Sequence, residues 1–283
     1  MVLTSVVHAL RMLSVHIGCE FIWAAEVPTA AVVQVEPRLD RSPVVVRDAW
    51  TTTPPMTSRT YWDHYANRCR RLVLPAEKVT LRYEALVHTE DHVDMADHRA
   101  PELAPGDLPD EALVFTLPSR YCQSDLVADD AWRLFGSVPA GYDRVQQICD
   151  FVNGHLTWTA GATTSVHSAL EVYDSKTGVC RDFAHLAISL CRALNIPARY
   201  AFGYLPDVGV PATDAPMDFC AWMEVYLGGG WYTFDPRNNA RRAGRVLVGV
   251  GRDALDVAMF TTFGGPELVN MDVWAEGGPP GAS

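Results

Sequence analysis

The feature that most constrains this chain of 283 residues is an apolar helical stripe that begins at a cysteine. Apolar side chains recur after Cys180 at three- and four-residue spacing, which predicts a helix with a buried face. Asn195 and Ile196-Pro197 then predict where this helix ends. The stripe consists of Phe183, Ala184, Leu186, Ala187, Leu190, Cys191 and Leu194. The segment is therefore predicted to be a core helix.

Cys180 lies at the predicted start of that helix, after the glycine-containing turn at 177–179. Unpaired N–H groups and the positive end of the helix dipole lower the pKa of a thiol at such a position, which is the geometry of a cysteine nucleophile. A cysteine that is buried as a small apolar side chain is the alternative. The helix pattern alone leaves both interpretations open.

Three aromatic-rich segments after the helix predict an antiparallel sheet. They cover residues 198–205, 219–227 and 231–235, and the glycines at 228–230 between the last two are typical of a tight turn. Asp235 is at the end of the third predicted strand, directly before Pro236. A core helix is thus followed by strands, with an acidic residue at a strand end.

Residues 140–265 resemble the bacterial transglutaminase-like superfamily, whose fold is related to papain-type cysteine proteases. The resemblance implies an α+β core in which the helix carrying Cys180 packs on an antiparallel sheet. It also implies that Cys180 is the nucleophile and that Asp235 orients a catalytic histidine. The first third of the chain resembles the β-rich, sandwich-like domain that often precedes this core. The matching pieces, in order, are Gly178-Val179-Cys180-Arg181-Asp182-Phe183-Ala184, Ile196-Pro197-Ala198-Arg199-Tyr200, Gly203-Tyr204, Ala221-Trp222-Met223-Glu224-Val225-Tyr226 and Trp231-Tyr232-Thr233-Phe234-Asp235.

The family's histidine does not match, because Cys220 stands where the family has a histidine before Ala-Trp. A thiol cannot replace imidazole both in taking a proton and in returning it to the leaving group. Three hypotheses follow. The protein is a pseudoenzyme that keeps a binding cleft, or Cys180 is activated by its helix start while another group supplies the proton, or Cys180 and Cys220 form a redox-sensitive pair.

Other side chains are weaker candidates for the cleft. His167 is predicted at the start of a helix before the Cys180 turn, where it lines the cleft or has a structural role. Tyr173 and Trp222 are cleft candidates, although packing in the strand core is the simpler interpretation of Trp222. His185 lies on the far side of the Cys180 helix and is predicted to be structural. No compact zinc spacing or calcium loop is found, so no metal and no cofactor are predicted.

Charge and cysteine usage narrow the partners and the compartment. The net charge of −11 argues against non-specific binding to nucleic acid. No run of about 18 apolar residues is found, so no membrane association is predicted. Seven cysteines without paired spacing indicate free thiols and a cytoplasmic protein. The predicted partner is a peptide, amide or acyl-thioester substrate, and the oligomeric state is left open.

Strand and turn patterns divide the chain into five parts. Residues 1–13 are predicted to be an N-terminal extension, 14–118 a β-rich domain, 119–139 a connection, 140–265 the transglutaminase-like catalytic-type domain and 266–283 a Gly/Pro-rich C-terminal tail. Strands are predicted at 14–23, 30–36, 59–72, 79–87 and 112–117, and a helix at 129–135.

Two functions are consistent with these observations. The first is thiol-dependent acyl chemistry through a Cys180 acyl-enzyme, which covers peptide or amide hydrolysis and acyl transfer, including transfer or cyclisation in natural-product pathways as the resemblance implies. The second is a catalytically impaired binding or redox-gated module. Loss of the histidine favours the second, whereas retention of Cys180, Asp235 and the residues around Cys180 favours the first.

Overall fold

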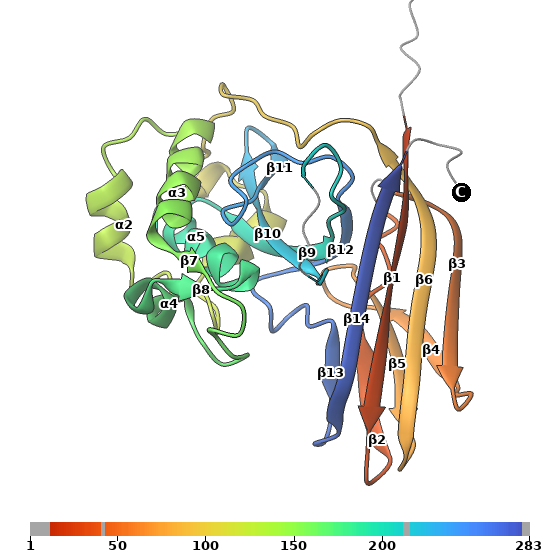
Figure 1. Ribbon diagram of the computed structural model, residues 1–283. Coiled ribbons are helices and arrows are strands. Elements are labelled where there is room, and N and C mark those ends of the chain that lie inside the picture. The colour runs from red at the N-terminus through yellow and green to blue at the C-terminus, as the bar shows by residue number, and fades with distance from the viewer. Residues whose placement is uncertain (1–11, 41–42, 212–215, 279–283) are drawn as a thin grey trace, which may run out of the picture.

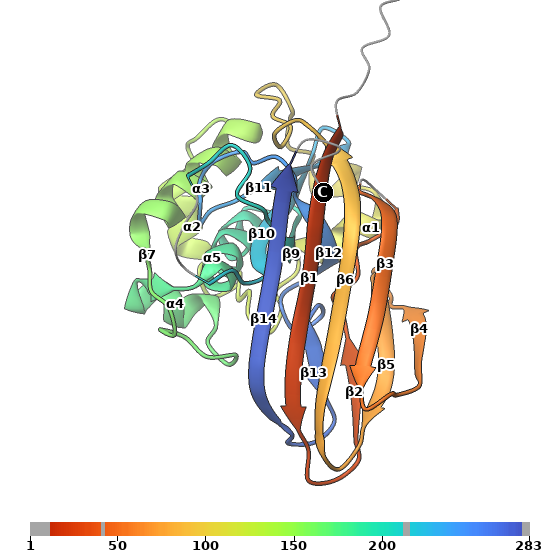
Figure 2. The same cartoon turned by 45° about the vertical axis from the view of Figure 1, so that its right-hand side comes forward.

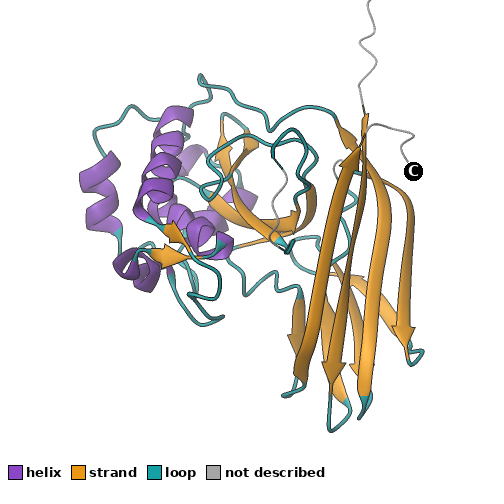
Figure 3. Cartoon of the chain, viewed as in Figure 1, coloured by secondary structure: helices purple, strands orange, loops and turns teal. Residues whose placement is uncertain are grey.

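The computed structural model describes residues 12–40, 43–211 and 216–278, and it places a β-sandwich beside a helical unit that has its own sheet (Figure 1). Helices gather on one side of the molecule and the long strands on the other (Figure 3). The α+β class predicted from the sequence is confirmed. No helix in the described ranges is long and apolar enough to cross a membrane.

Two four-stranded antiparallel sheets form the sandwich, and Figure 2 shows the strands of the first sheet side by side. Alternate side chains of β1 are buried, as the two-residue period of a strand requires. The rings of Phe21 in β1 and Phe260 in β13 lie 5.4 Å apart and join the two sheets. The first sheet has the order β14 (Glu267–Gly278), β1 (Met12–Ala24), β6 (Lys78–Glu90), β3 (Val44–Thr53), and the second β13 (Phe260–Thr262), β2 (Thr29–Val33), β5 (Arg68–Leu74), β4 (Ser58–Trp62).

In the helical unit, the central helix α5 packs against the other helices and an antiparallel sheet. The unit also contains a short parallel pair of strands. The sheet has the order β11 (Gly230–Phe234), β10 (Cys220–Leu227), β9 (Ala198–Tyr204), β12 (Val246–Gly251). The pair is β7 (Thr157–Trp158) with β8 (Thr177–Gly178). The helices are α2 (Ala128–Phe135), α3 (Tyr142–His155), α4 (Ala169–Ser175) and α5 (Cys180–Ala193), after the short turns η1 (Pro105–Asp107), α1 (Asp110–Leu113) and η2 (Val114–Thr116).

Helix α5 is the core helix that the apolar stripe predicts. Leu186, Ile188 and Leu190 have no exposed surface, because α5 packs against α2, α3 and α4 as well as against β9 and β10. Asn195, with a φ of 62°, adopts the left-handed conformation that commonly ends a helix. Packing on all sides therefore holds Cys180, the first residue of α5, in a fixed position.

The C-terminal segment differs from the tail predicted at 266–283. Residues 267–278 form β14, which pairs with β1 from Ser14 to Ala24, and residues 279–283 lie outside the described ranges. The glycines of this segment serve close packing. A Cβ on Gly277 would lie 2.4 Å from the Cγ2 atom of Val208, so the position has room only for glycine.

The sandwich differs from the sequence prediction in three further places. The strand predicted at 59–72 is two strands, because the Asp63 carboxylate accepts hydrogen bonds from the backbone N–H groups of Tyr65 and Asn67 and builds a turn. Residues 112–117, predicted as a strand, form the last residues of α1 and the turn η2. Strand β3 has no predicted counterpart, because most of its side chains are exposed on both faces and give no alternating pattern.

The sandwich and the helical unit share one continuous hydrophobic core and several hydrogen bonds. The Tyr204 hydroxyl in β9 donates to the Val35 carbonyl at 2.9 Å. The Asn67 side chain donates to the Val250 carbonyl at 2.8 Å and accepts from the Val250 N–H at 2.9 Å. The sheet that carries Cys220 is thus fixed to the β-rich half of the chain.

Gly203 in β9 is expected to tolerate no larger residue. A Cβ there would lie 2.0 Å from the Val246 carbonyl oxygen in the neighbouring strand β12, so Gly203→Ala must push two paired strands apart. We expect a loss of about 3 kcal/mol in the free energy of unfolding, measured by chemical denaturation. Gly230→Ala in β11, where no atom lies within 4 Å of the added Cβ, is the matched control. Equal losses in both variants would contradict this explanation.

Candidate active site

The turn that presents Cys180 is built around the Asp182 carboxylate. Asp182 Oδ2 accepts a hydrogen bond from the Val179 N–H at 2.9 Å and another from the Thr163 hydroxyl. Its Oδ1 accepts from the Arg181 guanidinium at 2.9 and 3.0 Å. A Cβ on Gly178 would lie 2.8 Å from the Asp182 Cβ. Gly178 and Asp182, on either side of Cys180, therefore fold this turn.

Cys180 and Cys220 are neighbours, as the resemblance implied for the nucleophile and the family's histidine. Cys180 is half-buried at the start of α5, whereas Cys220 at the start of β10 is 8% exposed, and both thiols are free. Hydrogen bonding from Cys220 lowers the pKa of Cys180; burial opposes this effect, and the Ala221 N–H supports it. The same contact, together with burial, holds the pKa of Cys220 well above its ordinary value. The contact thus lowers the pKa of Cys180 and raises that of Cys220. Each thiol also has a backbone carbonyl acceptor at 3.8 Å, Phe219 for Cys180 and Ala221 for Cys220.

Two charged residues at the cavity that borders Cys180 have opposite effects. The Arg237 guanidinium favours the Cys180 thiolate and lies over the Trp158 ring, 5.2 Å from its centroid. The Asp218 carboxylate opposes the thiolate, and partial desolvation raises the pKa of Asp218 itself. Asp218 accepts a hydrogen bond from the Phe219 N–H at 2.7 Å, which orients it at the start of β10.

Asp235 lies directly after β11. The matching aspartate of the family orients a histidine, whereas Asp235 accepts hydrogen bonds from Arg245 and Asn238. Asp235 Oδ2 accepts from Arg245 Nη2 at 2.8 Å and from Asn238 Nδ2 at 2.8 Å, while Oδ1 accepts from the Asn238 N–H at 2.9 Å. Arg245 also pairs with Asp94 at 2.9 Å. Although burial disfavours the charged guanidinium, Asp235 and Asp94 raise the pKa of Arg245. An imidazole at position 220 would have to compete with Arg245 for Asp235.

Each of the three further candidates from the sequence has its own packing or hydrogen-bond partners, and Cys180 packs against the core cluster that contains Trp222. His167 accepts a hydrogen bond from the Thr164 N–H at 3.0 Å within its own loop. Tyr173 stacks on His155, with 4.8 Å between the ring centroids. Trp222 is 1% exposed, in the same small core cluster as Cys220. None of the three is among the described residues that line the cavities beside Cys180.

Two cavities meet at Cys180, and both are lined by Val179, Cys180, Asp218, Phe219 and Cys220. One, the polar cavity, has a volume of about 460 Å³ and is further lined by Trp158, Ala160, Gly161, Leu205, Asp207, Pro216, Met217, Arg237 and Arg242. The other, the apolar cavity, has a volume of about 520 Å³ and is further lined by Tyr121, Ser165, Arg181, Tyr200, Phe202, Ala221 and residues 254, 255 and 257–261. The thiol of Cys180 thus faces two environments of different chemistry.

His185 holds the wall of the apolar cavity in place. Its ring is buried against Tyr121 and Tyr200, with centroids 5.3 and 5.0 Å away, and Nε2 accepts a hydrogen bond from the Ala254 N–H at 3.1 Å. Burial lowers the pKa of His185 to about 3, so the ring stays neutral near pH 7. His185 therefore has a structural role, as its position on the opposite side of the helix from Cys180 predicted.

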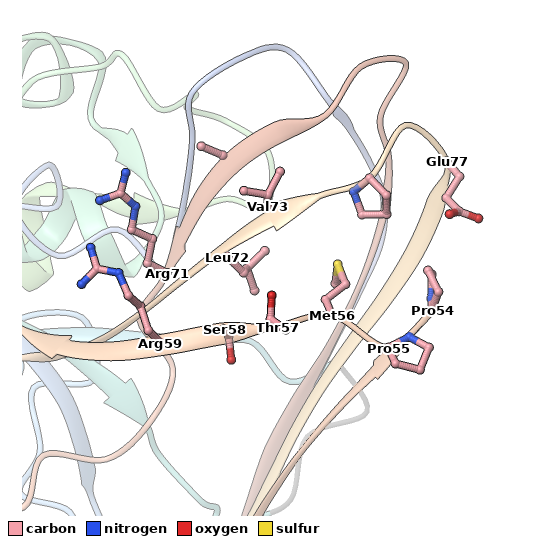
Figure 4. A pocket seen from close by; sticks show the side chains of 12 residues that line it. Pro54, Pro55, Met56, Thr57, Ser58, Arg59, Arg71, Leu72, Val73 and Glu77 are labelled. Atoms are coloured by element: carbon pink, nitrogen blue, oxygen red, sulfur yellow. The ribbon is translucent and has the colours of Figure 1, made fainter.

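A third pocket, of about 740 Å³, lies on the outer face of the sandwich (Figure 4). Prolines, Met56 and Val73 form much of its surface, and Figure 4 shows Arg59 and Arg71 side by side at one end. Its described lining includes no cysteine or histidine. In the described ranges, no cluster of three or more metal-binding side chains is present either. The lowered pKa of Cys180 makes the junction of the two cavities the candidate active site.

Comparison with known proteins shows which family and which solved structure this chain is similar to. A family model described as the transglutaminase-like superfamily matches residues 131–236. A solved structure from Cytophaga hutchinsonii, described as a proposed cysteine protease, is 32% identical, with a TM-score of 0.86 over 94% of this chain and 91% of that one. An uncharacterized protein of Mycobacterium leprae is 37% identical over 123 residues, and one of Mycobacterium tuberculosis is 36% identical over 111. The matches cover 42% and 35% of those two mycobacterial proteins.

Proposed function

The chain belongs to the transglutaminase-like superfamily, and on that premise we propose that it performs thiol-dependent acyl chemistry with Cys180 as the nucleophile. The thiolate attacks an acyl carbonyl, a sulfur–carbon bond forms, and the bond to the leaving group breaks. The acyl group stays on Cys180 as a thioester until water or another nucleophile takes it. The description of the Cytophaga hutchinsonii relative as a proposed cysteine protease is consistent with this class of reaction.

The observation that carries the proposal is the environment of the Cys180 sulfur. Hydrogen bonding from Cys220 and Ala221 and the charge of Arg237 lower the pKa of Cys180. Burial and the Asp218 carboxylate oppose this shift, and the Cys180 thiol, while protonated, donates to the Phe219 carbonyl at 3.8 Å. The sulfur is also a wall of both cavities, so a substrate reaches it. Structural cysteines of this chain have the opposite property, since burial raises the pKa of Cys122 to about 12.

Cys220 contributes to this chemistry as a hydrogen-bond donor to the thiolate, and it is no substitute for the histidine base. Its raised pKa keeps it protonated near neutral pH, so it neither accepts the Cys180 proton nor carries a charge. The lowered pKa of Cys180 raises the thiolate fraction of the resting protein, which takes the place of proton transfer to a histidine in this proposal.

A catalytically impaired binding or redox-gated module is the second candidate. Cys220 in place of the histidine favours it, and so does the contact between two free thiols. In this function a ligand binds beside Cys180 without acylating it. The reactivity of Cys180 separates acyl chemistry from a plain binding module, which has no need for an activated thiol. A redox-gated module also needs a reactive thiol, and it differs from an acyl enzyme in forming no thioester with an acyl donor.

The pH dependence of Cys180 alkylation tests the proposal. In the wild type, we expect iodoacetamide to label Cys180 with a half-maximal rate below about pH 8.5, the ordinary pKa of cysteine, because the rate follows the thiolate fraction. Cys220→Ala removes a donor, so the curve moves to higher pH and labelling at pH 7 slows about tenfold. Cys220→Ser keeps an O–H donor and stays near the wild type.

Peptide mass spectrometry measures each cysteine separately, with buried Cys122 and Cys149 as internal references. Failure of Cys180 to react ahead of these two would overturn the proposed function. Identical curves for the Ala and Ser variants would instead remove Cys220 from the activation of Cys180 and leave the nucleophile intact.

A further inference from the structure

Most of the lining of the apolar cavity suits a hydrocarbon group, and Arg181 and Asp218 are its charged residues. Tyr200 and Phe202 from β9 are 5% and 4% exposed, Val257 is 2% exposed, and Met259 completes the same wall. A volume of about 520 Å³ is in the range of small-molecule sites, which are mostly apolar. Burying a chain of methylene groups here is favourable by the hydrophobic effect, so this side of Cys180 prefers apolar groups.

The wall of the apolar cavity is anchored before any ligand arrives. The Gln34 N–H in the sandwich donates to the Met259 carbonyl at 2.9 Å. The ring of Phe260 packs on Trp23, with 4.7 Å between the centroids, and His185 fixes Ala254. The sandwich holds this wall on one side and α5 holds it on the other. The wall therefore needs little reorganisation when a ligand binds, and its fixed position limits the length of chain that fits.

The polar cavity has charged side chains that suit a polar leaving group on the side of the carbonyl opposite the acyl chain. It presents Arg237 together with Arg242, whose guanidinium pairs with Asp207 at 3.2 Å. The nucleophile that releases an acyl group must approach where the leaving group departed, because the second half of the reaction reverses the geometry of the first. A cavity with charged walls admits water or a polar nucleophile, so it suits the leaving group and the acceptor.

The groups that could donate a proton at this site limit which leaving group can depart. An amine leaves an acyl centre only when an acid protonates it, which is the second task of the histidine in a Cys-His-Asp site. The described lining of the two cavities contains no histidine. Its acidic groups include the Asp218 carboxylate, which accepts a hydrogen bond from the Phe219 N–H at 2.7 Å, and the Cys220 thiol, which donates to the Ala221 carbonyl. A thiol leaving group departs as a thiolate and needs no such acid.

We propose that the site takes thioesters of apolar acyl groups, with the acyl chain in the apolar cavity and the departing thiol in the polar cavity. This inference rests on the function proposed above and specifies its substrate class. In the first step the Cys180 thiolate and R–CO–SR′ give Cys180–S–CO–R and the thiolate R′S⁻. In the second, water or an amine takes the acyl group and its proton is released, which regenerates the Cys180 thiolate.

The test compares three donors that share the N-acetylaminoethyl group: the acetyl thioester, the hexanoyl thioester and the hexanoyl amide. Acyl-Cys180 formation is followed by intact-mass and peptide mass spectrometry on the full chain. We expect the hexanoyl thioester to acylate Cys180 at least about tenfold faster than the acetyl thioester, because four added methylenes are buried. The hexanoyl amide should be slower by at least about 100-fold.

A matched pair of variants locates the acyl chain. Ala258→Phe fills the apolar cavity, and Ala160→Phe adds the same group to the polar cavity. We expect Ala258→Phe to lower the ratio of the hexanoyl rate to the acetyl rate to near one. Ala160→Phe should keep the preference for hexanoyl. Thermal unfolding of both variants checks that the fold is unchanged.

The outcomes separate this inference from the proposed function. Equal rates for acetyl and hexanoyl donors, or equal losses in the two variants, would overturn the assignment of the apolar cavity. An amide that acylates as fast as its thioester would overturn the leaving-group argument. Acylation of Cys180 by none of the three donors, despite rapid labelling by iodoacetamide, would overturn the acyl chemistry itself.

Discussion

Cys180→Ala is expected to abolish acyl-enzyme formation and to lower kcat/KM for any acyl donor by at least about 1,000-fold. The variant removes the sulfur that forms the covalent bond and leaves the cavities in place. The loss is much larger than for a residue that only orients the nucleophile. Initial rates with the donor that is fastest for the wild type provide the measurement, and mass spectrometry should find no acylated peptide.

Two comparisons make the Cys180→Ala result specific. Cys180→Ser keeps an oxygen nucleophile, but without a base its hydroxyl stays protonated, so it should be nearly as inactive as the alanine variant. Arg59→Ala, in the pocket on the outer face of the sandwich, should retain the wild-type rate. If Cys180→Ala keeps more than about a tenth of the activity, the acyl chemistry takes place elsewhere.

Arg245→Met is expected to lower the free energy of unfolding by about 3–5 kcal/mol. Arg245 has a side chain that is 8% exposed, and it pairs with two buried carboxylates, Asp94 and Asp235. Methionine fills similar space but leaves both carboxylates without their cation. Burial of an unpaired charge is more costly than loss of an exposed ion pair, so the effect should exceed that of a surface substitution.

Chemical denaturation at pH 7 measures the Arg245→Met effect, and thermal unfolding should fall by on the order of 10 °C. Arg241→Met is the matched control, since Arg241 is exposed and makes one long hydrogen bond to the Asp94 carbonyl. A difference of less than about 1 kcal/mol between the two variants would show that Arg245 does not hold the Asp235 region together.

Local patterns in the sequence were sufficient for the elements next to the nucleophile. The apolar stripe from Phe183 to Leu194 predicted α5, and the aromatic segments predicted the strands that became β9, β10 and β11. These signals are short-range, because each depends on neighbours within one helix turn or one strand. The position of Cys220 beside Cys180 came from the resemblance to a family, since the two residues are far apart along the chain.

Long-range partners could not be predicted in the same way. Arg245 reaches Asp94 across 151 residues, and no local pattern joins those two positions. In the sequence Arg245 looks like a surface charge near the pair Arg241-Arg242. Strand β14 is not predicted for a different reason. Its glycines and prolines suggest a tail in the sequence, whereas in the structure a side chain at position 277 would collide with Val208.

The pairing of β1 with β14 affects the order in which the protein can mature on the ribosome. The first strand of the sandwich emerges early, but its partner β14 emerges after the whole helical unit, as does β13, which begins at Phe260 and pairs with β2. Until then the edge of β1 is open and the wall beside Cys180 is incomplete. A nascent chain that has already formed the Cys180 turn therefore lacks the complete wall of the apolar cavity until synthesis of the sandwich is complete.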